Sequence, residues 1–583
     1  MDKRGMNLKD ILSYSVRTEK VLFTFSILME LIILAAAHIM GMGGDLFLGT
    51  LMPIFDCYVI CFVASMLKKI RLDWIVWIIS TVIFTGELFT IIFYQSEYNI
   101  RVLQLVLETN PGEAGEFILS ALLHPALWIS IVTTAAAIYL SILLTGKIHL
   151  NQRLRPTFSW IGIALILWSG TRQIPAYIKL GRCLSAKGYE AFTEKRYMPH
   201  LSTTCVRLIH GIAFNKAQSS ELDVLTATVQ NTPESSSSKE CPLIVLIIGE
   251  SFSKYHTPLY IPQALPTNPK LERLKDDGYL IPYTDVVTTS NLTSNVMRNM
   301  FSMWDENYTD SWTKHTLFPA IFRKSGYNVW YLTNQFALNS SDIWNGIGGT
   351  IFNKPELSEC LFDWRNDALK QYDGDILDLI PDTMLIFNRP TLLIVHLMGQ
   401  HVKYKSRYPE EFDRFKSDDI RNEYGGTKGK QIIAEYANAT LYNDFVVDSI
   451  WSIVKGHDAV GIYLSDHGEE VYDWRDFHER TDEKQMSLNV AKYQFEIPFM
   501  FFMSDDFIKN HGDLAERIRI SHDRPLINSK LKHTLLRLAG ISTPEYKPTD
   551  DILSDEFDIN APRYIGNHIS YDSLLGNGET SNK

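Results

Sequence analysis

Long apolar runs fill the first 176 positions of the chain, whereas later apolar runs are short and separated by polar stretches. Five of the early runs reach the roughly 20 residues that an α-helix needs to cross a bilayer. The first is too long for a cleavable signal peptide and is followed by similar runs. Residues 1–176 are therefore predicted to form an N-terminal five-helix transmembrane bundle. The predicted spans are about 21–41, 48–67, 74–94, 125–145 and 157–176.

Basic residues are concentrated before the first span and in every second connection after it. Such segments stay on the cytoplasmic side of a membrane, so we expect a cytoplasmic N-terminus and, after five crossings, an external C-terminal part. In a bacterium this means an inner-membrane protein facing the periplasm. Three acidic residues, Glu30, Asp56 and Glu87, fall within spans. They either pair inside the bundle, lie near a span end or have a function.

Two segments connect the bundle to the rest of the chain in distinct ways. Residues 97–120 are too polar to cross the membrane, but apolar Val102, Leu103, Val106 and Leu107 predict an amphipathic helix on its outer surface. Residues 177–240 are an interfacial segment followed by a linker rich in Ser, Thr and Glu.

Residues 241–583 alternate short apolar runs with helical patterns such as 432–455. Continuous apolar runs of this length are typical of buried parallel strands, and their alternation with helices predicts an α/β domain with a mostly parallel central sheet. The predicted strands are 243–248, 329–332, 391–396, 459–464 and 498–502.

Overall charge and cysteine content narrow the classes of function. The net charge of -11 argues against a nucleic-acid partner, which needs a basic surface. The spacing of the six cysteines does not form a zinc site of the cysteine type. One or two disulfides are possible among the four cysteines beyond the predicted spans, which are Cys183, Cys205, Cys241 and Cys360.

Potential ligands follow four of the predicted strands, where the working residues of parallel sheets gather. Glu250 follows the first strand, and the pair Asp466-His467 follows the strand at 459–464. Mixed carboxylate and imidazole ligands suit zinc, with manganese as an alternative. The alternative structural interpretation is that Asp466 caps a turn and His467 packs locally. The other strand-end residues are Asn334, Gln335, His396 and His401.

A metal centre of this kind needs a nucleophile. Thr293 lies in a polar stretch before a helical pattern, and a metal-bound hydroxyl is a nucleophile at neutral pH. From the residues alone Thr293 is equally well an N-cap, and Thr289, Ser290 and Ser294 are equal candidates. His401 and His478 could each bind a second metal or a phosphate group.

These segments resemble the phosphoethanolamine transferases of the alkaline phosphatase and sulfatase superfamily, above all those that modify heptose in the lipopolysaccharide core. The resemblance covers nearly the whole chain. The matching segments are Ile247-Ile248-Gly249-Glu250-Ser251, Thr333-Asn334-Gln335, His396-Leu397-Met398-Gly399-Gln400-His401, Asn438-Ala439-Thr440-Leu441-Tyr442-Asn443-Asp444 and Ser465-Asp466-His467-Gly468-Glu469-Glu470.

The resemblance implies roles for individual residues. It selects Thr293 as the nucleophile and implies zinc at Glu250, Thr293, Asp466 and His467. His401 and His478 match positions that bind the phosphate group or a second zinc. The positions that bind the donor head group in the family are matched by Asn334 or Gln335, Thr109 and Glu113. Glu306 matches the position of a further acidic ligand.

Three departures from the family pattern concern the acceptor. Thr289 and Asn299 stand where members that modify lipid A carry cysteines. Leu338 lies near the position of a frequent lysine, and Leu105 stands where some members have a polar head-group contact.

The implied reaction has two steps: Thr293 takes phosphoethanolamine from phosphatidylethanolamine, and an envelope acceptor, lipopolysaccharide core or lipid A, then receives it. A monomer is expected to suffice. The rival functions are a phosphoglycerol transferase of the lipoteichoic-acid-synthase type and a membrane phosphodiesterase. A sulfatase activity is disfavoured, because the chain lacks the Cys/Ser-x-Pro-x-Arg context of a sulfatase nucleophile.

Overall fold

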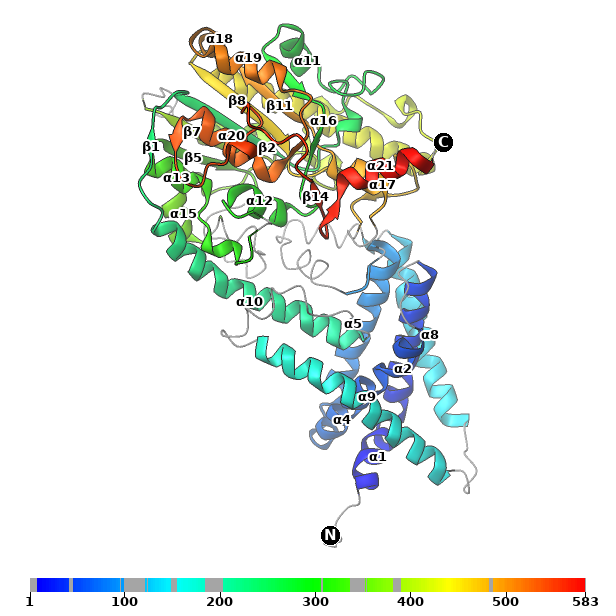
Figure 1. The fold of residues 1–583 in the computed structure, drawn as a ribbon. Helices are drawn as coiled ribbons and strands as arrows, with labels where there is room; N and C mark the ends of the chain where they lie inside the picture. Colours follow the sequence, from blue (N-terminus) through cyan, green and yellow to red (C-terminus); the bar gives the residue numbers. More distant parts are fainter. Residues whose placement is uncertain are drawn as a thin grey trace. The chain divides into compact units, whose positions relative to one another are not determined.

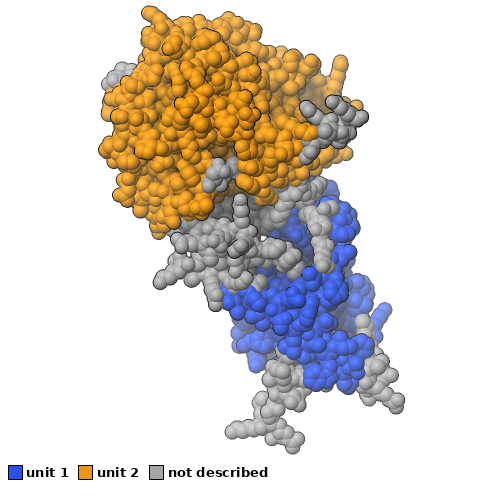
Figure 2. Space-filling view, viewed as in Figure 1, with its two compact units in different colours: residues 1–220 blue, residues 221–583 orange. Residues whose placement is uncertain are grey.

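The computed structural model divides the chain into two compact units, residues 1–220 and 221–583 (Figure 2). The structure describes residues 8–40, 46–94, 96–98, 121–122, 124–147, 155–183, 203–305, 308–335, 352, 354–380, 389–481 and 486–581. The predicted surface helix near 97–120, with Thr109 and Glu113, lies almost entirely outside these residues, and so does Glu306.

The first unit is helical (Figure 1). Its α2 presents Leu22, Phe25, Met29 and Ile33 to the interior of the bundle at helical spacing. Its helices are α1 (Leu8–Thr18), α2 (Lys20–Ile39), α3 (Leu46–Leu51), α4 (Pro53–Leu67), α5 (Asp73–Tyr94), α8 (Pro125–Lys147) and α9 (Arg155–Cys183), and α10 (Thr204–Gln230) continues into the second unit.

Four stretches of the described chain are long and apolar enough to cross a membrane. They are Lys20–Ile39, Leu46–Ile70, Asp73–Tyr94 and Pro125–Lys147. The predicted fifth span forms part of α9 but is not among them, and this span itself contains the polar residues Arg172 and Gln173, which lower its hydropathy. The fifth crossing thus stays a prediction.

The three acidic residues of the predicted spans are buried in the first unit. Glu87 pairs with Arg207 of α10 at 2.5 Å, and the backbone N–H of Thr204 donates to Glu30 Oε1 at 3.3 Å. At least these two carboxylates therefore have partners within the helical unit. Cys205, like Cys241 and Cys360 in the second unit, is a free thiol, so these three residues form no disulfide.

The second unit is built on a seven-stranded sheet that contains all five predicted strands. Its order is β3 (Leu280–Tyr283), β11 (Phe499–Met503), β8 (Ala459–Ser465), β2 (Leu243–Gly249), β7 (Thr391–His396), β5 (Asn328–Thr333) and β6 (Trp364–Arg365). The neighbours from β8 to β6 are parallel. Strand β11 is antiparallel to both β8 and β3, so the sheet is mixed.

Helices cover both faces of this sheet (Figure 1). Successive residues of β2 alternate between two cores: Leu243, Val245 and Ile247 join one, and Ile244, Leu246 and Ile248 join the other. The first core contains residues of α11 (Pro269–Asp276) and α16 (Gly426–Val454). The second contains residues of α12 (Thr293–Phe301), α13 (Phe318–Lys324), α15 (Pro355–Leu361), α18 (Asp505–Asn510), α19 (Gly512–Ile520) and α20 (Leu531–Leu538). Helices α17 (Leu488–Phe495) and α21 (Tyr571–Ser581) pack against each other nearby.

Candidate metal centre

The two central strands of the sheet bring Glu250 and Asp466 together. Strands β2 and β8 are parallel, and Gly249 pairs with Ser465 at their ends. The next residue of each strand is therefore a carboxylate at the same edge of the sheet. The backbone N–H of Asp466 donates to Gly249 O at 3.0 Å, and that of Ser251 donates to Asp466 Oδ1 at 3.1 Å. These hydrogen bonds hold the two turns against each other.

Glu250, Asp466 and His467 form a compact group of potential metal ligands. Their ligand atoms all lie within 4.8 Å of one another, and the three residues are buried. His467 Nε2 lies 3.1 Å from Glu250 Oε1 and 3.0 Å from Asp466 Oδ2. The arrangement supplies two oxygen ligands and one nitrogen ligand, a set that zinc accepts.

The hydrogen bonds around His467 favour a cation at this position. Its Nδ1 lies 2.9 Å from Gly468 O, which only a protonated nitrogen can satisfy, so Nε2 faces the carboxylates. Asp466 Oδ2 is buried and has no hydrogen-bond partner. The same Nε2 also lies 2.6 Å from Nη1 of Arg480, so a positive charge already stands at the point where the oxygen and nitrogen ligands converge, and a metal ion bound to Nε2 would take over that contact. The residues present therefore fit a metal ion.

The three ionisable groups shift one another's pKa values. Burial, followed by the charge of Glu250, raises the pKa of Asp466. Burial alone would raise the pKa of Glu250, but the charge of His467 holds it well below its ordinary value. Burial and the charge of Arg480 lower the pKa of His467, but the two carboxylates outweigh them and raise it to about 9. The negative charges are thus stable only beside a positive one.

Thr293 is the hydroxyl that the structure places beside this group. It is the first residue of α12, and its Oγ1 donates to Glu250 Oε2 at 3.0 Å and lies 3.4 Å from His467 Nε2. The other candidates have different surroundings: Thr289 Oγ1 accepts from Asn299, Ser290 Oγ from Leu292 N, and Ser294 Oγ is buried without a hydrogen-bond partner.

The remaining predicted site residues divide into two groups. Gln335 Nε2 donates to Glu250 Oε2 at 3.1 Å, and burial lowers the pKa of His401 to about 3 although the charge of Glu250 raises it. Asn334 instead donates to Asp373 at 2.9 Å, at the base of the loop after β7. His478 stacks on Tyr472, and His396 is buried at the end of β7, 3.2 Å from Tyr331 OH.

Sequence reasoning missed Arg480 and Glu469. Arg480 Nη1 lies 2.6 Å from His467 Nε2, and Arg480 Nε lies 3.4 Å from Glu469 Oε2. The signal for Glu469 was its place in the segment that follows β8. Arg480 follows a stretch of mixed polar residues, in which nothing distinguishes it from Arg475.

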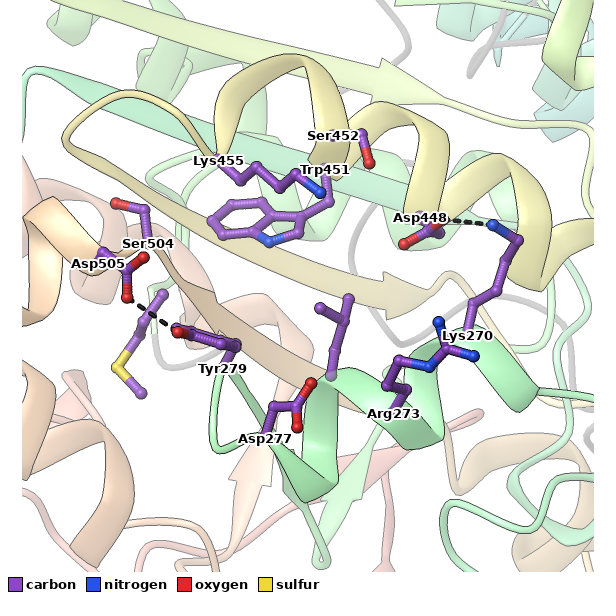
Figure 3. Close-up of a pocket in the computed structure, with 12 residues that line it drawn as sticks. Lys270, Arg273, Asp277, Tyr279, Asp448, Trp451, Ser452, Lys455, Ser504 and Asp505 are labelled. Atoms are coloured by element: carbon purple, nitrogen blue, oxygen red, sulfur yellow. Dashed lines mark hydrogen bonds and ion pairs between the residues drawn. The ribbon is translucent and has the colours of Figure 1, made fainter.

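A pocket lies elsewhere on the second unit, and none of the candidate ligands lines it. Figure 3 shows its lining, which includes the ion pair of Lys270 with Asp448 at 2.7 Å and the hydrogen bond from Tyr279 OH to Asp505 at 2.9 Å. Met503, another lining residue, pairs with Val460 at the start of β8. Asp466 follows the other end of β8, so the pocket lies at the end of this strand that is far from the candidate ligands.

A family model described as Sulfatase matches residues 242–541. The chain belongs to the sulfatase family. All four residues of the candidate centre lie inside the matched range, and so do Arg480 and Glu469. The family match therefore covers the whole site.

A named relative shows which members of the sulfatase family this chain resembles. Phosphoethanolamine transferase EptC of Escherichia coli strain RS218 is 26% identical over 501 residues, which cover 83% of this chain and 82% of that protein. This match confirms the resemblance to phosphoethanolamine transferases that the sequence motifs indicated. The resemblance indicates that the protein is an enzyme.

Solved structures support the fold. The C-terminal periplasmic domain of E. coli EptC in complex with Zn superposes with a TM-score of 0.50 at 26% identity, covering 60% of this chain and 99% of that one. The integral membrane lipooligosaccharide phosphoethanolamine transferase A of Neisseria meningitidis gives a TM-score of 0.53 at 18% identity, covering 93% of this chain and 97% of that one. The similarity to the N. meningitidis protein includes residues of both units.

One glycine packs against the backbone of the candidate metal centre, which leads to a prediction. Gly399 has a φ of +49°, and a Cβ there would lie 2.7 Å from Glu250 O. Gly399→Ala is expected to cost roughly 2–4 kcal/mol of stability, from backbone strain and from the collision, and to displace Glu250. Thermal unfolding and bound zinc measure the two effects.

Gly278→Ala is the matched control. Gly278 also has a positive φ, +81°, but a Cβ there meets nothing within 4 Å. It is expected to cost only about 1 kcal/mol and to leave zinc binding unchanged. Equal losses of stability and of zinc in the two variants would show that the contact with Glu250 is unimportant.

Proposed function

We propose that the protein transfers phosphoethanolamine from phosphatidylethanolamine to a cell-envelope acceptor, lipopolysaccharide core or lipid A, through a covalent ester on Thr293. The observation that carries the proposal is the position of the Thr293 hydroxyl, 3.0 Å from Glu250 Oε2 and 3.4 Å from His467 Nε2. A hydroxyl that borders a carboxylate and imidazole ligand set is placed for metal-assisted nucleophilic attack. The name of the E. coli relative supports the identity of the transferred group.

Zinc is the cofactor that we propose, held by Glu250, Asp466, His467 and the hydroxyl oxygen of Thr293. The mixed ligand set and the zinc complex of the homologous E. coli domain support it, and manganese is the less favoured alternative. Bound zinc would lower the pKa of the Thr293 hydroxyl and offset negative charge on the phosphate.

The protein's own residues supply the rest of the reaction. The Thr293 hydroxyl donates a hydrogen bond to Glu250 Oε2 in the structure, which orients its oxygen. In the first step a bond forms between Thr293 Oγ1 and phosphorus while the bond from phosphorus to diacylglycerol breaks. The released diacylglycerol oxygen takes up the proton that Thr293 loses. In the second step an acceptor oxygen displaces Thr293, and the proton that the acceptor loses restores the Thr293 hydroxyl.

The helical unit explains why such a reaction would be tied to a membrane. Both the donor and the proposed acceptor are lipids, so an enzyme held at the bilayer surface meets them at high local concentration. We propose that it lies in a bacterial inner membrane with a cytoplasmic N-terminus and a periplasmic catalytic domain. A cytoplasmic N-terminus and a periplasmic catalytic domain require an odd number of crossings. We therefore propose that α9 crosses the membrane in addition to the four candidate spans.

Protease protection would test this topology. External protease is expected to digest the catalytic unit in spheroplasts, and to spare it in inverted inner-membrane vesicles until detergent is added. A cytoplasmic loop tag between the second and third candidate spans serves as the internal control. Protection in spheroplasts together with digestion in inverted vesicles would rule out the fifth crossing.

Mass spectrometry of the trapped intermediate tests the function itself. Incubation with phosphatidylethanolamine is expected to add about 123 Da to Thr293, the mass of phosphoethanolamine less water. Parallel incubation with labelled phosphatidylglycerol tests the rival phosphoglycerol transferase, and release of free phosphoethanolamine without acceptor tests the rival phosphodiesterase. Label from phosphatidylglycerol on the protein, or an adduct on another residue of an active enzyme, would refute the proposal.

A further inference from the structure

Arg480 is an unusual neighbour for a metal site. Its side chain is 15% exposed, and its Nη1 approaches His467 Nε2 to 2.6 Å. The same ring nitrogen faces Glu250 and Asp466. Thr293 Oγ1 lies 3.4 Å from that nitrogen as well. The Thr293 hydroxyl and the Arg480 guanidinium group therefore both lie next to His467 Nε2.

Two contacts hold the guanidinium group there. Arg480 Nη1 donates to Asn291 O at 3.1 Å, two residues before Thr293. Arg480 Nε lies 3.4 Å from Glu469 Oε2, whose other oxygen accepts from Tyr404 OH at 2.8 Å. Both Glu469 and Tyr404 are buried. Within the described residues, no hydrogen bond or ion pair engages Nη2, so part of the planar fork is available to a ligand.

The charge balance of the site shows what that ligand would be. Glu250 and Asp466 together offset the charge of a divalent ion, so the centre they form is neutral. A neutral centre attracts a phosphodiester anion weakly, and buried Glu469 adds further negative charge beside it. A fixed positive charge on the side of Thr293 compensates for this. Arg480 is the arginine in contact with the ligand set within the described part of the chain.

We propose that Arg480 forms a phosphate-binding subsite that holds the non-bridging oxygens of the phosphodiester beside Thr293, with Glu469 as its positioning residue. The proposal deepens the proposed function and rests on it for the identity of the substrate. The ligand class is a tetrahedral phosphate anion. An arginine suits this task because its planar fork binds two phosphate oxygens at once, which a lysine cannot do.

A merely structural role for Arg480, as a clamp on the loop at Asn291, makes a different prediction. Loss of such a clamp would lower stability and displace Thr293 without a specific effect on anion binding. Loss of a phosphate subsite would weaken anion binding even when folding and zinc content are preserved. Phosphate affinity, measured separately from activity, therefore separates the two roles.

The test is calorimetric titration of inorganic phosphate into the full-length, zinc-loaded protein in detergent micelles. Arg480→Ala is expected to weaken phosphate binding by roughly 10- to 100-fold, as for a lost hydrogen-bonded charge, with unchanged zinc content. Arg480→Lys is expected to be intermediate, and it carries the test if the alanine variant does not fold. Phosphate affinity within about 2-fold of wild type in both variants would overturn the proposal.

Arg475→Ala is the matched control. Arg475 pairs with buried Glu470 at 2.5 Å, so its removal leaves a neighbouring buried carboxylate without its arginine, as the removal of Arg480 does. It is expected to keep the phosphate affinity of the wild type. Equal losses in both alanine variants would show a general effect of destabilisation and would overturn the subsite.

The outcome also separates this inference from the proposed function. If the wild type binds phosphate through Arg480 but forms no adduct with phosphatidylethanolamine, the subsite stands and the proposed substrate fails. If the wild type forms the adduct while the Arg480 variants bind phosphate as it does, the proposed function stands and the subsite fails.

Discussion

Thr293→Ala is expected to reduce release of diacylglycerol from fluorescent phosphatidylethanolamine by about 1,000-fold or more, because it removes the oxygen that forms the bond to phosphorus. Thr293→Ser keeps that oxygen and is expected to retain measurable turnover and to form the same adduct. Zinc content should change little in the serine variant, since Glu250, Asp466 and His467 still converge.

Ser294→Ala is the control for this experiment. Ser294 is the next residue of α12, is buried, and makes no hydrogen bond through Oγ. Its loss is expected to leave turnover within about 3-fold of the wild type, as befits a hydroxyl that contacts nothing reactive. Full activity of Thr293→Ala, or loss of activity confined to Ser294→Ala, would assign the nucleophile to another residue.

Glu250→Gln and Asp466→Asn are expected to have the second large effect. Each removes one charged oxygen ligand from a group whose ligand atoms lie within 4.8 Å of one another. We expect zinc affinity to fall by more than the roughly 10- to 100-fold that the loss of a partner outside the ligand set costs, and turnover to fall with it. Metal analysis after dialysis, together with the turnover assay, measures both quantities.

Chelation and a third variant complete that experiment. Treatment with a chelator is expected to abolish turnover of the wild type and to lower its melting temperature, and added zinc should restore both. Asp444→Asn is the matched control, because Asp444 is an equally buried carboxylate that accepts from the backbone of α11. Its variant should keep its zinc. Normal zinc binding and turnover in Glu250→Gln or Asp466→Asn would refute the metal centre.

Much of the second unit could be predicted because its signals are local. A run such as Leu243–Gly249 is apolar at every position, and only a strand covered on both faces buries such a run completely. The candidate ligands Glu250 and Asp466 directly follow two such runs, so their meeting at one edge required only that the two strands be parallel neighbours. The register of Gly249 with Ser465 satisfies that condition.

Other features cannot be predicted from local sequence patterns. The run at 498–502 predicted a strand but not its direction, and β11 is antiparallel to β8, because the direction depends on how the intervening segment returns to the sheet. Partners such as Glu87 and Arg207 are 120 residues apart in the chain, and no periodicity relates them. The predicted fifth span, 157–176, also stays open, since Arg172 and Gln173 lie within it.

The sequence by itself determined the apolar runs of the helical unit, the five strands, and the ligands Glu250, Asp466 and His467 at the strand ends. These follow from local hydrophobicity and from residues adjacent to it. The family resemblance of the sequence had also selected Thr293, but only the tertiary structure showed that its hydroxyl, and Arg480, meet those candidate ligands. Thr293 reaches them because α12 begins beside β2, and Arg480 because the chain after His467 returns to the site. Such meetings depend on packing between distant segments, which adjacent residues do not encode.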